Sequence, residues 1–64
     1  MKEQATLTFK DAASGDEACV IIRYSASNVA IALSLASNGD VEIVLPRADV
    51  DRLIEALTSA RSKM

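Results

Sequence analysis

The sequence predicts an α+β fold, in which a four-stranded antiparallel meander sheet is followed by one C-terminal helix packed on one face (ββββα). Apolar residues alternate with period two from residue 5 to residue 45, which is typical of half-buried strands. From residue 46 to residue 64 they recur every three or four residues, as in an amphipathic helix. The only proline, Pro46, lies where one period replaces the other. With 64 residues, the chain has room for a single domain, residues 1–64.

Turn-forming residues divide the alternating region into four predicted strands, at about residues 5–10, 18–25, 29–36 and 40–45. In the first strand Leu7 and Phe9 share a face, and Thr6 and Thr8 share the other. The other three strands alternate in the same way, so each strand has one face with large apolar side chains. We expect these faces to lie together and to form the core side of the sheet.

The loop of residues 25–28 determines how the second and third strands pair. It sets Tyr24 opposite Val29 and Ile22 opposite Ile31, which keeps large apolar residues on a common face. A slip of one residue would move every side chain to the wrong face.

Two turns compete between the third and fourth strands. A two-residue turn would set Leu35 opposite Glu42, whereas a three-residue loop sets Leu35 opposite Val41 and keeps the apolar faces together. We therefore predict a type I turn closed by a bulge, with Gly39 in the left-handed conformation.

The predicted helix covers about residues 46–61. Proline has no backbone donor and a fixed φ, so Pro46 ends the ladder and suits the first helical turn. We expect the apolar stripe of the helix to cover the core side of the sheet. The stripe consists of Val50, Leu53, Ile54 and Leu57, continued by Ala60 and Met64.

The opposite sheet face is unusually small and apolar for a solvated one. The predicted registers place Ile21, Ala32 and Val44 in one cross-strand row away from the helix. We predict that this face forms an interaction interface in a homodimer or with another protein. The predicted interface residues are Cys19, Ile21, Arg23, Ala30, Ala32, Ser34, Glu42 and Val44. Two alternatives remain: a few exposed Ile and Val are normal on any protein surface, and association can use a strand edge instead.

Self-association is also what a chain of this size needs. A small core is marginal unless a disulfide, a metal or a partner supplements it. The single cysteine, Cys19, excludes an internal disulfide, and the chain has no histidine. A partner chain is the supplement that remains, and a homodimer is the simplest form of it.

No catalytic or ligand-binding motif is present. Cys19 has no histidine to activate it, so a structural role is expected. The acidic residues around Gly15 lack the spacing of a calcium loop. The carboxylates of the helix, Asp49, Asp51 and Glu55, are typical of a solvated helix face. We therefore expect no enzyme activity, no metal and no cofactor.

The net charge of −2, without a run of either sign, gives no attraction to nucleic acid or to anionic lipid. The fold is similar in outline to that of some single-strand-binding coactivators, so a nucleic-acid-binding or regulatory role using Lys10 and Arg23 at a sheet edge is the alternative function. Against it, the chain has two aromatic residues, Phe9 and Tyr24, both assigned to the core side. The lone cysteine and the absence of an apolar leader or span favour a cytoplasmic protein.

Overall fold

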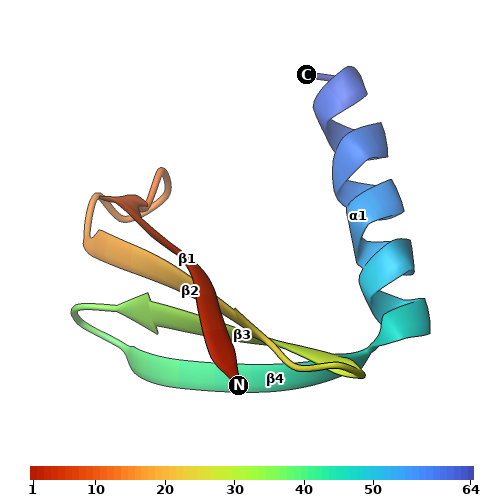
Figure 1. Ribbon diagram of the computed structural model, residues 1–64. Helices are drawn as coiled ribbons and strands as arrows, with labels where there is room; N and C mark the ends of the chain where they lie inside the picture. Colours follow the sequence, from red (N-terminus) through yellow and green to blue (C-terminus); the bar gives the residue numbers. More distant parts are fainter.

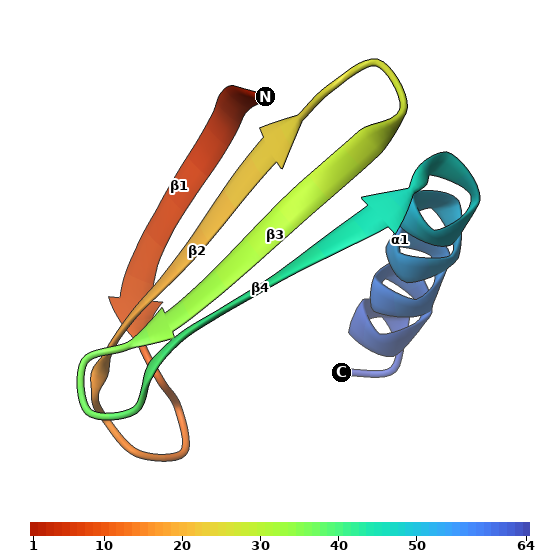
Figure 2. The ribbon, with the colours of Figure 1, turned by 90° about the horizontal axis from the view of Figure 1, so that it is seen from below.

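The computed structural model describes residues 1–64 and has the element order ββββα (Figure 1). The four strands form one open sheet in the order β1-β2-β3-β4, with every neighbouring pair antiparallel (Figure 2). The α+β fold class and the meander are therefore confirmed. The elements are β1 (Lys2–Lys10), β2 (Glu17–Tyr24), β3 (Asn28–Leu35), β4 (Gly39–Pro46) and α1 (Arg47–Ser62). The largest difference from the predicted bounds is at β1, which begins three residues before residue 5.

The pairing of β2 with β3 is the one predicted. Tyr24 lies opposite Val29, and Ile22 lies opposite Ile31. The β1–β2 ladder contains a bulge between Glu3 and Ala5, after which the two strands pair without interruption to Lys10 and Glu17. The alternation of faces therefore continues from β1 across β2 and β3.

The predicted pairing of β3 with β4 is wrong by two residues. Leu35 lies opposite Gly39 rather than Val41, and Leu33 lies opposite Val41. The reason is that Ala36 belongs to the turn, in which the Asn38 N–H donates to the Leu35 carbonyl oxygen at 3.2 Å. A shift of two residues leaves every side chain on its predicted face, so the hydrophobic pattern does not reveal it. The left-handed Gly39 is confirmed, with a φ of 78°.

The two faces of the sheet keep the predicted composition. We call the helix side the inner face, and the side away from the helix the outer face. The inner face carries Leu7, Phe9, Val20, Ile22, Ile31, Leu33, Val41 and Ile43. The outer face carries Cys19, Ile21, Arg23, Ala30, Ala32, Ser34, Glu42 and Val44.

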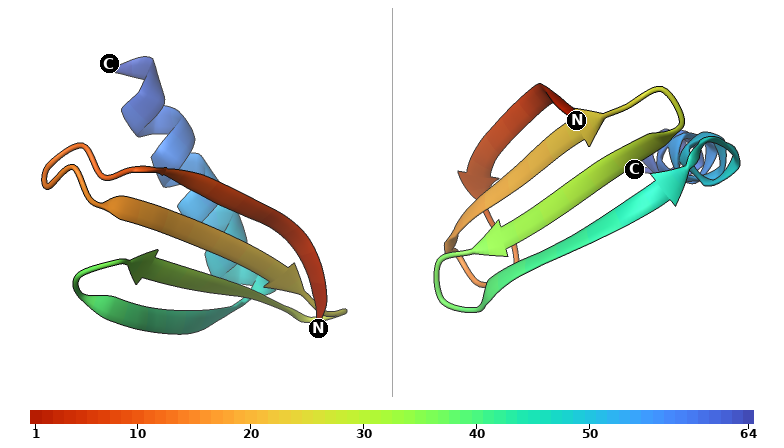
Figure 3. Two further views of the ribbon diagram at one scale, coloured as in Figure 1. Left: turned by 90° about the vertical axis from the view of Figure 1, so that its left-hand side faces the viewer. Right: turned by 60° about the horizontal axis from the view of Figure 1, so that its bottom comes forward.

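The helix α1 follows β4 without a linker. Pro46 is the last residue of β4, lies opposite Asn28, and is extended with φ −69° and ψ 164°. It therefore precedes the helix rather than opening its first turn, which was the prediction. From Arg47 the helix rises over the inner side of the sheet and contacts β4 and β3 (Figures 1 and 3). The helix is neither long enough nor apolar enough to cross a membrane.

The helix covers far less of the inner face than its apolar stripe predicts. None of its Cα atoms lies within 8 Å of a Cα atom of β1 or β2, and its C-terminal half stands away from the sheet (Figures 1 and 2). Ala18 and Ala30 are the only buried residues of the chain. The expectation that the stripe covers the whole inner face is therefore wrong. The large side chains left exposed include Leu7, Phe9, Leu33, Val41 and Ile43 of the sheet, with Ile54 and Leu57 of the helix.

Candidate interaction faces of the sheet

The outer face brings all eight predicted interface residues together on one side of β2, β3 and β4. The expected row of Ile21, Ala32 and Val44 does not form, because Ala32 lies opposite Glu42 and Val44 lies opposite Ala30. This change follows directly from the two-residue shift of β4. The observed rows are Arg23–Ala30–Val44, Ile21–Ala32–Glu42 and Cys19–Ser34–Asp40.

An ion pair crosses the middle of the outer face. Arg23 on β2 donates to the carboxylate of Glu42 on β4, so the pair spans β3 diagonally between the rows of Ala30 and Ala32. The alanine side chains are short, and long side chains can lie over them. Ala30 is consequently 2% exposed. The centre of the outer face is thus shielded by the chain's own side chains, while Val44 at the edge strand stays 55% exposed.

The arginine of this pair is incompletely satisfied. Its Nε is buried and has no hydrogen-bond partner, although one Nη donates to Glu42. An unmade hydrogen bond of a charged group is costly. The outer face therefore contains one buried polar atom without a hydrogen-bond partner, next to small apolar side chains.

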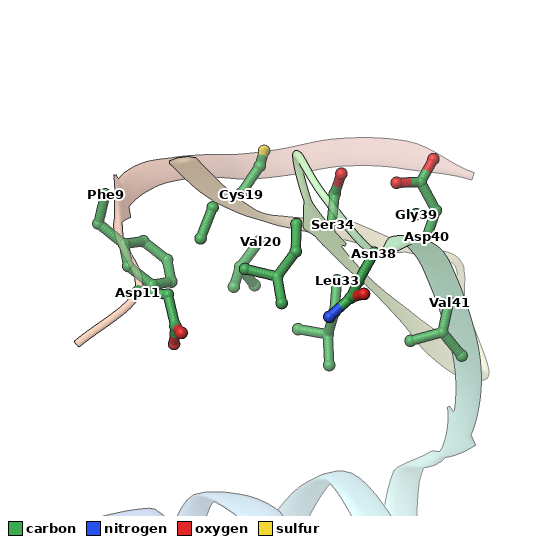
Figure 4. Close-up of a pocket in the computed structure, with 12 residues that line it drawn as sticks. Phe9, Asp11, Cys19, Val20, Leu33, Ser34, Asn38, Gly39, Asp40 and Val41 are labelled. Carbon is green, nitrogen blue, oxygen red and sulfur yellow. The ribbon is translucent and has the colours of Figure 1, made fainter. Parts of the chain in front are cut away.

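The inner face is hollowed at the end opposite the strand–helix junction. A depression of about 390 Å³ lies there, formed by β1, β2, β3 and the start of β4. Figure 4 shows Phe9, Val20, Leu33 and Val41 extending to the helix side of the sheet, with Cys19, Ser34 and Asp40 on the opposite side. The large side chains of this concave face are between 45% and 57% exposed at Leu7, Phe9, Leu33, Val41 and Ile43. Large apolar side chains are normally packed against a second layer of structure, and no second layer of this chain covers them in this region.

The acidic residues near the depression are engaged in turn structure. Asp11 accepts hydrogen bonds from the Ser14 hydroxyl at 2.6 Å and the Ser14 backbone N–H at 2.9 Å. The hydroxyl bond, followed by the backbone bond, lowers the pKa of Asp11 below its ordinary value of 3.8. Asp16 accepts a hydrogen bond from the Ser37 hydroxyl, which ties the β1–β2 loop to the β3–β4 turn. These carboxylates therefore hold the two loops at this end of the sheet.

Lys10 and Arg23, the two basic residues named for the alternative nucleic-acid-binding role, lie far apart along the strands. Lys10 ends β1 opposite Glu17, whereas Arg23 lies near the other end of β2 and is paired with Glu42. The aromatic Phe9 is 47% exposed, but it shares its depression with Asp11. The sheet edge thus does not gather the positive charge that a phosphate backbone requires.

No group of three or more His, Cys, Asp or Glu side chains is arranged to hold a metal ion. Cys19 is a free, half-buried thiol on the outer face. Asp49 on the helix pairs with Arg52 at 3.1 Å on an exposed surface. Comparisons of the chain with protein-family models, curated proteins and solved structures found no match.

The open inner face is the feature that the sequence pattern did not reveal. An amphipathic helix next to an apolar sheet face predicts that the two cover each other within one chain. The signal that bears on this point is the direct passage from Pro46 to Arg47, which leaves no linker to turn the helix back over the sheet. The candidate site therefore comprises two faces, of which the inner one is the larger unpartnered apolar surface.

Proposed function

We propose that the protein is a small, non-enzymatic, cytoplasmic interaction module that works as a homodimer. The observation that carries this proposal is the surface of the single chain. Its accessible area is 5042 Å², whereas a compact 6.8 kDa monomer exposes roughly 3,950 Å². The excess of about 1,100 Å² per chain exceeds the roughly 800 Å² per partner of a standard protein interface.

The dimensions of the chain support the same proposal. Its radius of gyration is 12.9 Å, compared with about 10.7 Å for a compact domain of 64 residues. With two alanines as the only buried residues, the chain has no large apolar side chain that is fully buried. Burial of such side chains is the dominant favourable term in folding, so the single chain lacks the layer that stabilises domains of its size.

The inner face is favoured over the outer face as the dimer interface. The inner face is concave and its side chains are large and exposed, whereas the centre of the outer face is shielded by Arg23 and Glu42. Large apolar side chains gain more from burial than alanines do. The outer face, with Val44 at its edge, then remains available to another protein.

The solution mass tests the proposal. Sedimentation equilibrium over a range from micromolar to several hundred micromolar is expected to give twice the 6.8 kDa of one chain. The unfolding midpoint is expected to rise with protein concentration, because association stabilises the folded state by mass action. A folded chain that stays monomeric throughout this range, with a concentration-independent midpoint, would overturn the homodimer.

A further inference from the structure

We propose that the occupant of the inner face is the helix α1 of a second copy, and that the two copies exchange helices reciprocally about a two-fold axis. This inference rests on the proposed homodimer and specifies which surfaces meet in it. Each helix lies across the partner's sheet with its stripe of Leu53, Ile54 and Leu57 against the exposed residues of the inner face. The contact is isologous, so it closes at two chains.

Two apolar surfaces of the chain lack a partner, and they are complementary in shape. One is the concave inner face, with its depression beside Phe9, Leu33 and Val41. The other is the convex helix stripe, where Ile54 is 57% exposed and Leu57 is 62% exposed. A foreign peptide on the sheet would cover the first surface and leave the second in water. A second copy covers both surfaces on both chains.

The lengths of the two surfaces agree. The helix has 16 residues and is therefore about 24 Å long. The strands β2, β3 and β4 have eight residues each and are about 26 Å long. One helix thus spans the inner face from the strand–helix junction to the depression at the far end.

The chain's own helix is held away from this position. The only residue at the junction, Pro46, belongs to β4, lies opposite Asn28, and has its φ restricted by the ring. Arg47, the first helical residue, donates from Nη2 to the Ala26 carbonyl oxygen at 3.4 Å, which ties the start of α1 to the β2–β3 loop. Folding the helix flat over β1 and β2 requires these arrangements to break. The partner's helix reaches the same surface without changing the junction.

A disulfide trap tests the exchange. In a Cys19→Ala background, Leu33→Cys is prepared in a ¹⁵N-labelled chain, and Leu53→Cys and Leu57→Cys are prepared separately in unlabelled chains. Labelled and unlabelled chains are unfolded together, refolded and oxidised under mild conditions. We expect linked peptides that join position 33 of a labelled chain to position 53 or 57 of an unlabelled one, with a doubling of the covalent mass. A disulfide requires Cβ atoms within about 4.5 Å, so the bond reports direct contact.

The matched control is Ser59→Cys, which lies on the opposite side of the helix from Leu57 and is expected to give no bond to position 33. A chain carrying Leu33→Cys and Leu57→Cys together separates the alternatives. A doubled covalent mass whose linked peptides join position 33 of one chain to position 57 of the other supports the exchange. An internal bridge between positions 33 and 57 at the mass of one chain overturns it, because the helix then packs on its own sheet. If the wild type sediments as a dimer but no helix–sheet bond forms, the homodimer stands and the helix exchange is overturned.

Discussion

Both faces of this sheet carry apolar residues, yet the two faces differ in the size of those side chains and in what they leave exposed. The outer face carries alanines at its centre, and the Arg23–Glu42 pair lies over them, so that Ala30 is 2% exposed. The inner face carries Leu and Ile at equivalent positions, and Leu33 remains 45% exposed. Small side chains are shielded by their neighbours within one layer. Large side chains extend beyond the sheet and need a second layer of structure to pack against.

This difference indicates which face requires a partner. The presence of apolar residues on the side away from the helix favours the outer face, because such residues are unexpected on a solvated sheet face. Side-chain size and exposure favour the inner face instead. Substitutions on each face that are compared with a matched position elsewhere separate the two possibilities.

The sharpest test uses two adjacent residues of β4. Ile43 on the inner face is 49% exposed and Val44 on the outer face is 55% exposed in the single chain. Ile43→Glu is expected to weaken the dimer by more than about 100-fold, since it places an unpaired charge in the interface. Val44→Glu is expected to change stability by about 0.5 kcal/mol or less, as at an ordinary surface position. Sedimentation and urea unfolding measure both effects.

The reverse outcome has a clear meaning. If Val44→Glu dissociates the dimer and Ile43→Glu does not, the outer face is the interface, as the sequence pattern alone suggested. If both variants remain dimeric, an edge strand carries the association.

The second prediction concerns the helix stripe. Leu57→Ala is expected to destabilise the dimer by about 2 kcal/mol per chain, because the side chain is removed from a packed interface. In a lone chain, where Leu57 is 62% exposed, the same change would cost much less. Ser59→Ala on the other side of α1 is the control. Equal, small losses for the two variants, measured by unfolding at several protein concentrations, would contradict packing of the stripe.

How far the sequence predicts this structure depends on which property is asked for. The parity of each strand, the β2–β3 register and the left-handed Gly39 follow from local pattern and turn chemistry. The β3–β4 register does not, because a shift of two residues leaves the faces unchanged and the choice depends on whether Ala36 joins the turn. Periodicity also cannot show whether the helix stripe meets its own sheet or a partner's. That depends on the geometry at Pro46, which no pattern of apolar residues encodes.

The same limits apply to the candidate site. The eight outer-face residues do lie together, because parity alone decides it. The sequence predicts Arg23 and Glu42 only as members of this face, and the structure pairs them across β3 over its centre. The inner face is exposed because α1 does not pack over β1 and β2, and the sequence pattern does not predict the absence of that tertiary contact.

The third prediction tests whether the Arg23–Glu42 ion pair shields the outer face from association. Arg23 and Glu42 have side chains that are each 42% exposed, so their interaction is screened by solvent. Arg23→Ala and Glu42→Ala are each expected to cost about 0.5 kcal/mol, with a coupling of similar size in the double variant. The coupling should fall in high salt. The solution mass is expected to stay unchanged in all three variants, and its loss would assign the dimer contact to the outer face.

The smallest expected effect is a pH dependence at the far end of the inner face. The Ser14 hydroxyl and backbone N–H lower the pKa of Asp11 below 3.8 in the folded chain. A lowered folded-state pKa means that the carboxylate stabilises the folded state at pH values above 3.8, and that this contribution is lost as the pH falls through the folded pKa. Because Asp11 is at the surface, the effect is expected to be local: relative to the intrinsic exchange rate at each pH, the amides of its loop should lose protection at acid pH while the strands keep theirs. Asp11→Asn should remove the pH dependence of this loop protection. If instead the dimer dissociates along the Asp11 titration, the loop belongs to the interface, and the contact on the inner face extends beyond its apolar residues.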